Sequence, residues 1–268
     1  MGWVTEFAGR RLARFLTKPV RQSTQIATAT QEQLAAALRP GDVLLVEGNT
    51  RVSIAIKFLT QSTWSHAALY VGDVLPSREP WQLPRVLIEA DLEEGVRAVT
   101  LAHYARLHTR ICRAVGLSDE DRKRVVEYAV ARLGQQYDLK NVLDLARYLL
   151  PTPPVPTRFR RRLLALGSGD PTRAICSTLI AQAFQSVRYP ILPETRREWS
   201  DDPTCADCYA EIYRIRHHSL FAPRDFDISP FFEVVKPTIE SGFDYRALKW
   251  DDAVDDAERS RPAEAGAA

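Results

Sequence analysis

WSHAALYV, residues 64–71, is an apolar stretch with a polar beginning. Because side chains alternate between the two faces of a strand, this stretch predicts a β-strand that carries His66, Ala68 and Tyr70 on one face. Similar short runs, bounded by glycine, proline or charged residues, lie on both sides of it, at 42–47, 85–90, 96–101 and 110–115. Short strands with this spacing predict an antiparallel meander.

Helical patterns surround these strands. Ser118 begins the string Ser-Asp-Glu-Asp, which is typical of a helix N-terminus, and Gly134 is placed to end that helix. Helices are expected at 28–38, 52–59, 118–133, 138–150 and 174–187, and one more strand at 209–215. The long connection at 151–172 contains several prolines and a basic cluster, and it is a candidate lid or membrane-facing element because loops of this length are often functional.

Composition limits the class of protein. With 268 residues, 45% hydrophobic and 26% charged, the chain is neither disordered throughout nor collagen-like, and it can bury a sizeable core. A net charge of +2 gives no general reason to expect a nucleic-acid partner. We expect a folded domain at 39–249, preceded by a helical segment at 1–38 and followed by an acidic, disordered tail at 250–268.

The first 22 residues predict an amphipathic helix. Arginines and a lysine gather on one side of it, apolar residues on the other, and Trp3 and Phe7 lie at the border. Neither a signal-peptide core nor a membrane-spanning stretch is present, so a cytoplasmic location is expected. The basic face favours reversible attachment of residues 1–22 to an anionic membrane surface, which would make the protein peripheral at the inner membrane face. The alternative is that the apolar stripe packs on the folded domain.

Cys176 lies near the beginning of the helix expected at 174–187. A thiol at a helix N-terminus is close to unpaired backbone N–H groups and to the positive end of the helix dipole, both of which favour the thiolate. Cys176 also lies on the apolar face of this helix, beside Leu179 and Ile180, so a buried core cysteine is the alternative interpretation.

His66 and Glu89 are the matching candidates for a base and a carboxylate. His66 begins a strand, and a histidine of near-neutral pKa can deprotonate a thiol. Glu89 lies among aliphatic residues in the next strand, where burial of an unpaired carboxylate is costly, and an imidazole N–H is a suitable partner. Thiol, base and carboxylate are the parts of a cysteine-hydrolase triad, although spacing alone does not bring them together. The alternative is that His66 is a buried histidine with its hydrogen bonds satisfied.

Several short strings, taken in order, resemble a known family. The strings are GDVLL (41–45), IK (56–57), WSH (64–66), LIEA (87–90), LGQQYD (133–138), ICS (175–177) and APRDF followed by SP (222–230). Together they resemble the circularly permuted, NlpC-like, papain-fold cysteine hydrolases of the YiiX type, which are distantly similar to the lecithin retinol acyltransferase relatives. The resemblance covers about residues 39–235.

The resemblance implies an α+β, permuted papain-like fold with an antiparallel sheet packed on helices, and a chain order in which the histidine precedes the cysteine. It implies that Cys176 is the nucleophile, that His66 is the general base and then the general acid, and that Glu89 orients His66. Tyr137, together with Ser65 and Ser177 beside the candidate base and nucleophile, is expected to contact the substrate. No cofactor is implied.

The leading hypothesis for function is a thiol hydrolase that cleaves an amide or ester bond through an acyl-enzyme. Its substrate would be a small acyl compound, a peptide or a lipid. Two alternatives stay open: a membrane-associated acyltransferase or lipid hydrolase, and a catalytically silent peripheral membrane or scaffold protein. Specificity depends on the shape of the pocket, which the sequence does not resolve.

A possible metal site competes with this interpretation. Cys205 and Cys208 form a C-x-x-C string, and His217 and His218 follow it, which gives four potential zinc ligands. Adjacent histidines point to opposite faces of a strand, and only one C-x-x-C is present, so we expect no metal here and loosely packed thiols instead. His103 and His108, in a polar stretch between two predicted strands, are expected at the surface.

Overall fold

The computed structural model describes residues 15, 17–20, 27–76, 83–136, 175–199 and 209–249. Most of the amphipathic segment at 1–22 lies outside these ranges, as do the helix expected at 138–150, the connection at 151–172 and the tail at 250–268. Among the described residues, no helix is long and apolar enough to cross a membrane.

The described chain alternates between strands and short helices. The strands are β1 (Val43–Val46), β2 (His66–Tyr70), β3 (Arg85–Asp91), β4 (Gly95–Thr100), β5 (Thr109–Ala114), β6 (Glu194–Trp199), β7 (Tyr209–Arg214) and β8 (Phe232–Val235). The α-helices are α2 (Gln31–Ala37), α3 (Arg51–Thr60), α4 (Asp119–Val130), α7 (Ile175–Ser186), α8 (Pro223–Asp227) and α9 (Pro237–Glu240). Four 3₁₀ turns complete it: η1 (Gly72–Val74), η2 (Leu101–Tyr104), η3 (His218–Leu220) and η4 (Tyr245–Ala247).

The main sheet has six strands in the order β4-β3-β2-β1-β5-β8, and all neighbours are antiparallel. The predicted meander is correct for β1 to β4 and wrong for β5, which pairs with the free edge of β1 instead of continuing beside β4. The chain after β4 turns through η2 and returns, so that Val46 lies opposite His66 on one side and Thr109 on the other. β1 is therefore an inner strand, buried on both faces, which explains its continuous apolar run.

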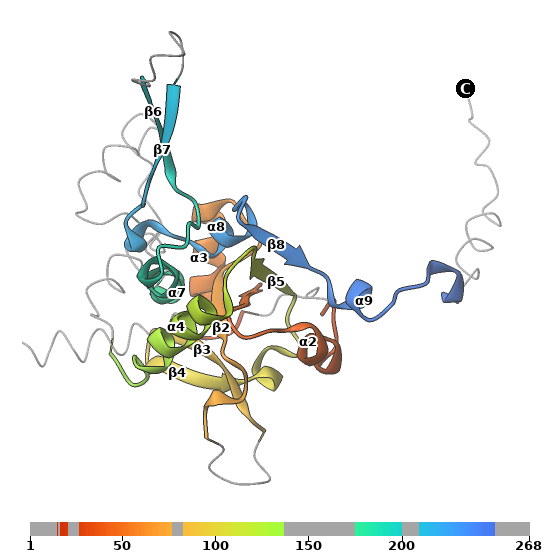
Figure 1. Ribbon diagram of the computed structural model, residues 1–268. Helices are drawn as coiled ribbons and strands as arrows, with labels where there is room; N and C mark the ends of the chain where they lie inside the picture. Colours follow the sequence, from red (N-terminus) through yellow and green to blue (C-terminus); the bar gives the residue numbers. More distant parts are fainter. Residues whose placement is uncertain are drawn as a thin grey trace, which may run out of the picture.

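Helices cover both faces of this sheet. On one face, α4 and α7 pack together against β2 and β3, and Figure 1 shows the two helices side by side over these strands. On the other face, α2 and η2 pack on the alternate residues of the same strands. The buried apolar residues form two clusters, one on each side of the sheet, and both clusters pack against β2 and β3.

Local sequence signals explain the helix boundaries. The Ser118 hydroxyl accepts a hydrogen bond from the backbone N–H of Asp121 at 3.1 Å, as expected for the N-terminus of α4. Thr30 and Gln33 form a reciprocal capping box that begins α2. α2 comes from the segment expected to precede the folded domain, yet Leu34 on this helix is buried against the main sheet.

Two strands were not anticipated. β6 pairs with β7 in a separate two-stranded sheet, which extends away from the main sheet in Figure 1. β6 reads Glu-Thr-Arg-Arg-Glu-Trp and has no apolar alternation that would mark it as a strand. β8 adds only four residues to the outer edge of β5.

Candidate active site

His66 and Glu89 project from the same face of neighbouring strands. Leu69 in β2 pairs with Ile88 in β3, so the residues that alternate with this pair share the opposite face. His66 Nε2 lies 2.5 Å from Glu89 Oε2. The imidazole ring is one quarter exposed, whereas Glu89 is 2% exposed. A buried carboxylate therefore contacts one nitrogen of a ring that faces a pocket.

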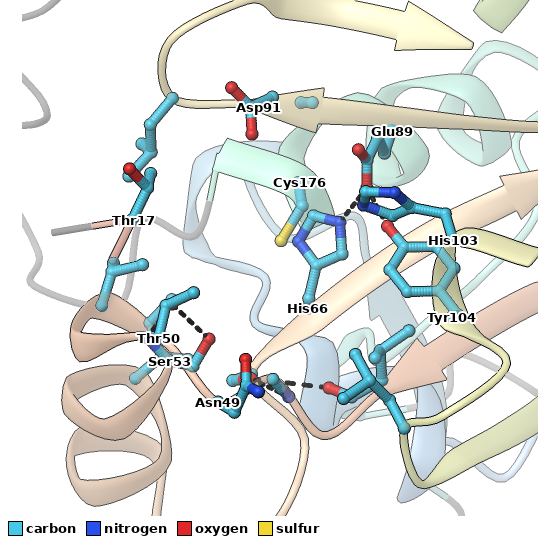
Figure 2. Close-up of a pocket in the computed structure, with 18 of the residues that line it drawn as sticks. Thr17, Asn49, Thr50, Ser53, His66, Glu89, Asp91, His103, Tyr104 and Cys176 are labelled. Atoms are coloured by element: carbon cyan, nitrogen blue, oxygen red, sulfur yellow. Dashed lines mark hydrogen bonds and ion pairs between the residues drawn. The ribbon is translucent and has the colours of Figure 1, made fainter. Parts of the chain in front are cut away.

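Cys176 reaches this pair from the other side. It is the second residue of α7, which packs against β2 and β3. Figure 2 shows its sulfur beside the His66 ring, away from the nitrogen that contacts Glu89. The His66 side chain and the backbone of Ala67 interact favourably with the thiolate form of Cys176, and Ser177 Oγ lies 4.0 Å from the sulfur. The imidazole thus bridges a thiol and a carboxylate.

The electrostatics favour the charged form of all three groups. Burial raises the pKa of the Cys176 thiol, but the His66 imidazolium and the hydrogen bonds around the sulfur outweigh it, and the net shift of this pKa is downward. Burial also opposes a charged His66, but the adjacent thiolate and Glu89 raise its pKa well above the ordinary value. Both shifts favour a thiolate–imidazolium pair of Cys176 and His66.

Glu89 remains a carboxylate down to strongly acidic pH. Burial raises its pKa, but His66 and Arg97 together lower the pKa to about 2. The Arg97 Nε–H donates to Glu89 Oε1 at 2.7 Å, and the Tyr104 hydroxyl donates to Oε2. The carboxylate is consequently able to accept a hydrogen bond from His66 over the whole neutral range.

A pocket of about 650 Å³ opens in front of these residues. Its lining includes Cys176, His66 and Glu89. The wall that comes from β1, α3 and the turn after β3 is rich in apolar residues: Val46, Val52, Ile56, Leu59 and Leu92. The site therefore combines a buried nucleophile with an apolar space large enough for a small organic group.

Thr17 forms part of the rim of this pocket, and the residues after it contact the chain before α3. Val20 N–H donates to the Asn49 carbonyl at 2.8 Å, just before α3. The Thr17 hydroxyl donates to Glu93 Oε1 at 2.6 Å, in the turn between β3 and β4, and Figure 2 shows Thr17 at the edge of the pocket. The end of the N-terminal segment thus contacts two walls of the candidate site.

The three residues expected to contact substrate have different positions. Ser65 lines the pocket, but its hydroxyl accepts a hydrogen bond from the backbone N–H of Gly48 at 2.9 Å and is buried. Ser177 is completely buried behind Cys176. Tyr137 lies outside the described residues. Substrate contact by these three residues stays a prediction.

Arg97 and Tyr104 are the site residues that the sequence analysis missed. Glu89 lies directly opposite Arg97 in the β3–β4 pairing, so a register for this hairpin would have predicted their contact. Tyr104 lies in η2, and no periodic pattern in the sequence marks it. It reaches Glu89 only because the chain turns back across the sheet after β4.

The remaining histidines do not join the triad. The rings of His217 and His218 lie 4.1 Å apart, while Cys205 and Cys208 lie outside the described residues. Within the described ranges, no group of three or more His, Cys, Asp or Glu residues is arranged to hold a metal ion. His103 is exposed beside the pocket, whereas His108 is half-buried and contacts Glu47 at 3.3 Å.

The site combines a thiol at a helix start, an imidazole at a strand start and a carboxylate on the adjacent strand, with the histidine earlier in the chain than the cysteine. This is the arrangement expected of a permuted papain-like cysteine hydrolase. Residues 37–148 match the family described as "Permuted papain-like amidase enzyme, YaeF/YiiX, C92 family". This match confirms the expected similarity to the YiiX-like family, and it agrees with the expected α+β fold class and the cysteine-hydrolase class of enzyme. The matched range includes His66 and Glu89.

Among solved structures, the chain is similar to the metalloprotein YiiX from Escherichia coli O157:H7. The two are 16% identical, with a TM-score of 0.42 over 75% of this chain and 97% of that one. A search of the curated proteins finds no match.

Proposed function

We propose that the protein cleaves an amide or ester bond through Cys176, His66 and Glu89, with an acyl-enzyme intermediate. The observation that supports this most strongly is the position of the His66 ring between the thiol and a carboxylate that receives three hydrogen bonds. This arrangement supplies a nucleophile, a proton carrier and a group that fixes the ring of that carrier.

In the first half of the reaction, the Cys176 thiolate attacks the carbonyl carbon of the substrate. Backbone N–H groups in the first turn of α7, including that of Cys176, have no partner within the helix and are suited to stabilise the developing oxyanion. The His66 imidazolium then gives its proton to the amine or alcohol as the bond to this leaving group breaks. A thioester remains on Cys176, and His66 is neutral.

In the second half, neutral His66 takes a proton from a water molecule whose oxygen attacks the thioester carbon. The carbon–sulfur bond breaks, the carboxylic acid product leaves, and the thiolate–imidazolium pair is restored. Glu89 keeps its charge throughout, because its pKa is far below neutrality, and it stabilises the imidazolium form of His66.

The experiment is a comparison of the wild type with Cys176→Ala on N-acyl amines, short peptide amides and lipid esters. Cys112→Ala is the matched control, because Cys112 is another buried thiol and lies in β5 away from the pocket. We expect the Cys112 variant to keep the activity and the Cys176 variant to lose it. Equal activity in all three proteins would contradict the proposal and would favour a silent scaffold protein.

A second candidate function is lipid hydrolysis or transfer of the acyl group to an acceptor other than water. The apolar wall formed by Val52, Ile56 and Leu59 favours it, since such a wall suits an acyl chain better than a polar peptide. Product analysis with and without an added amine distinguishes the two outcomes. A new N-acyl product would indicate transfer, and free acid alone would indicate hydrolysis.

Attachment to a membrane is a separate part of this proposal. The basic, amphipathic character of residues 1–22 supports reversible binding to anionic lipid, because each basic residue near such a surface contributes about 1 kcal/mol. Sedimentation with anionic vesicles at low and high salt tests it. Binding that salt abolishes is expected, and a protein that ignores these vesicles at low salt would contradict it.

A further inference from the structure

Glu89 receives hydrogen bonds from three different elements. Oε1 accepts from Arg97 Nε in β4 at 2.7 Å, and Oε2 is shared by His66 in β2 and the Tyr104 hydroxyl in η2. Tyr104 is 4% exposed. Because both carboxylate oxygens are held, the plane of the carboxylate has a fixed orientation relative to the His66 ring.

Arg97 is itself fixed by two further carboxylates. Its Nη2 lies 3.4 Å from Asp91 Oδ2 and its Nη1 lies 3.0 Å from Glu94 Oε1. Asp91 Oδ1 also accepts the backbone N–H groups of Glu93 and Glu94, at 2.7 and 2.9 Å. The guanidinium therefore joins the β3–β4 turn, which forms one wall of the pocket, to the carboxylate of the triad.

The β3–β4 turn, which precedes Arg97, packs closely against the chain that follows α4. Gly95 has a φ of +74°, and a Cβ at this position would lie 2.3 Å from the carbonyl oxygen of Gln135. Val96 N–H donates to the same oxygen at 2.9 Å. This close backbone approach leaves the turn, and with it the Arg97 side chain, little freedom to shift.

We propose that Arg97 and Tyr104 are positioning residues, which hold the Glu89 carboxylate in line with His66 and influence Cys176 only through that contact. The inference rests on the proposed function. The two residues contribute differently. Arg97 supplies a positive charge and a bond to the oxygen that His66 does not use, whereas Tyr104 supplies a neutral donor to the oxygen that His66 does use.

This division predicts two distinguishable effects. Arg97→Gln removes a cation beside Glu89, so the pKa of Glu89 rises and the acid limb of the activity profile moves to higher pH. Arg97→Lys keeps the positive charge, so its acid limb should lie close to the wild-type position. Tyr104→Phe removes a neutral donor but no charge, so it lowers kcat and moves the acid limb less than Arg97→Gln does.

The experiment measures kcat and KM for hydrolysis of p-nitrophenyl acetate as a function of pH. Arg97→Gln and Tyr104→Phe are each expected to lower kcat about tenfold or more with little change in KM, because each removes a hydrogen bond to a charged group. Matched controls lie far from the pocket. Arg124→Gln removes a surface ion pair with Asp121, and Tyr189→Phe removes a hydroxyl that donates to the Phe231 carbonyl.

Values of kcat within about twofold of the wild type for both Arg97→Gln and Tyr104→Phe would overturn the inference, since a lost charged hydrogen bond costs more than that. Equal losses in the two control variants would overturn it as well, because the effect would then be one of general stability. If Arg97→Gln does not fold, the kcat of Tyr104→Phe, which keeps every ion pair of Arg97, tests the inference by itself.

The same experiment separates this inference from the proposed function. Turnover of p-nitrophenyl acetate that persists in Cys176→Ala would overturn the proposed function and the inference with it. Turnover that requires Cys176 but is unaffected by the Arg97 and Tyr104 substitutions would overturn the inference and leave the proposed function in place.

Discussion

Glu89→Gln should change the pH dependence of stability as well as activity. In the folded protein the pKa of Glu89 is about 2, against an ordinary value of 4.5. Since one pKa unit corresponds to about 1.4 kcal/mol, ionised Glu89 stabilises the folded state by about 3 kcal/mol at neutral pH. The causes are the His66 and Arg97 charges, which outweigh the cost of burial.

The direction of this pH dependence follows from the lowered pKa of Glu89. The stabilisation is complete above the unfolded-state pKa of 4.5 and is lost as pH falls toward about 2. By pH 3, roughly 2 of the about 3 kcal/mol are lost, because the unfolded chain has already taken up the proton and the folded chain has not. A glutamine at this position does not titrate, so the variant lacks this part of the pH dependence.

Urea unfolding of the wild type and Glu89→Gln at pH 7 and pH 3 measures this difference. We expect the gap between the two free energies of unfolding to narrow by about 2 kcal/mol between these pH values. Glu120→Gln is the control, because Glu120 is exposed on α4. A gap that stays constant with pH would refute the reasoning, since Glu89 would then have an ordinary pKa in the folded protein.

Three other predictions follow from described contacts and from the N-terminal sequence. His66→Ala should raise the pKa of Cys176, because burial remains and the imidazolium is gone, and the rate of iodoacetamide labelling at pH 6 should fall about tenfold or more. Arg113→Met should destabilise the protein to urea by about 3–5 kcal/mol, because it leaves the buried Asp42 carboxylate without its bidentate partner. Neutralising the arginines within residues 1–22 should weaken sedimentation with anionic vesicles and leave p-nitrophenyl acetate hydrolysis unchanged.

Much of the strand structure could be predicted because it is local. β2 and β3 match the expected ranges 64–71 and 85–90 to within two residues, since alternation and flanking turn residues are visible in the sequence. The position of β5 was wrong because the order of strands depends on which free edge a returning chain meets. The outer edge of β4 and the free edge of β1 were both within reach of the short connection after β4.

In the site, too, the residue types could be predicted from the sequence, whereas their meeting depends on the fold. Cys176, His66 and Glu89 were identified as candidates by residue type and by their places at element ends or among aliphatic residues. Their meeting depends on how α7 packs against the sheet, which spacing does not determine. Tyr104 was missed because a tyrosine in an irregular segment carries no signal until the fold brings it to Glu89.

The central claim is that Cys176 is a thiolate held by His66, and the pH dependence of its alkylation tests this most directly. Iodoacetamide labelling of each cysteine, followed by peptide mass spectrometry, gives separate rates for Cys176 and for Cys112, whose pKa burial raises to about 12. The account predicts that Cys176 reacts rapidly at pH 6, well below the ordinary thiol pKa of about 8.5. A Cys176 rate that is negligible at pH 6 and rises only near the ordinary thiol pKa would contradict it.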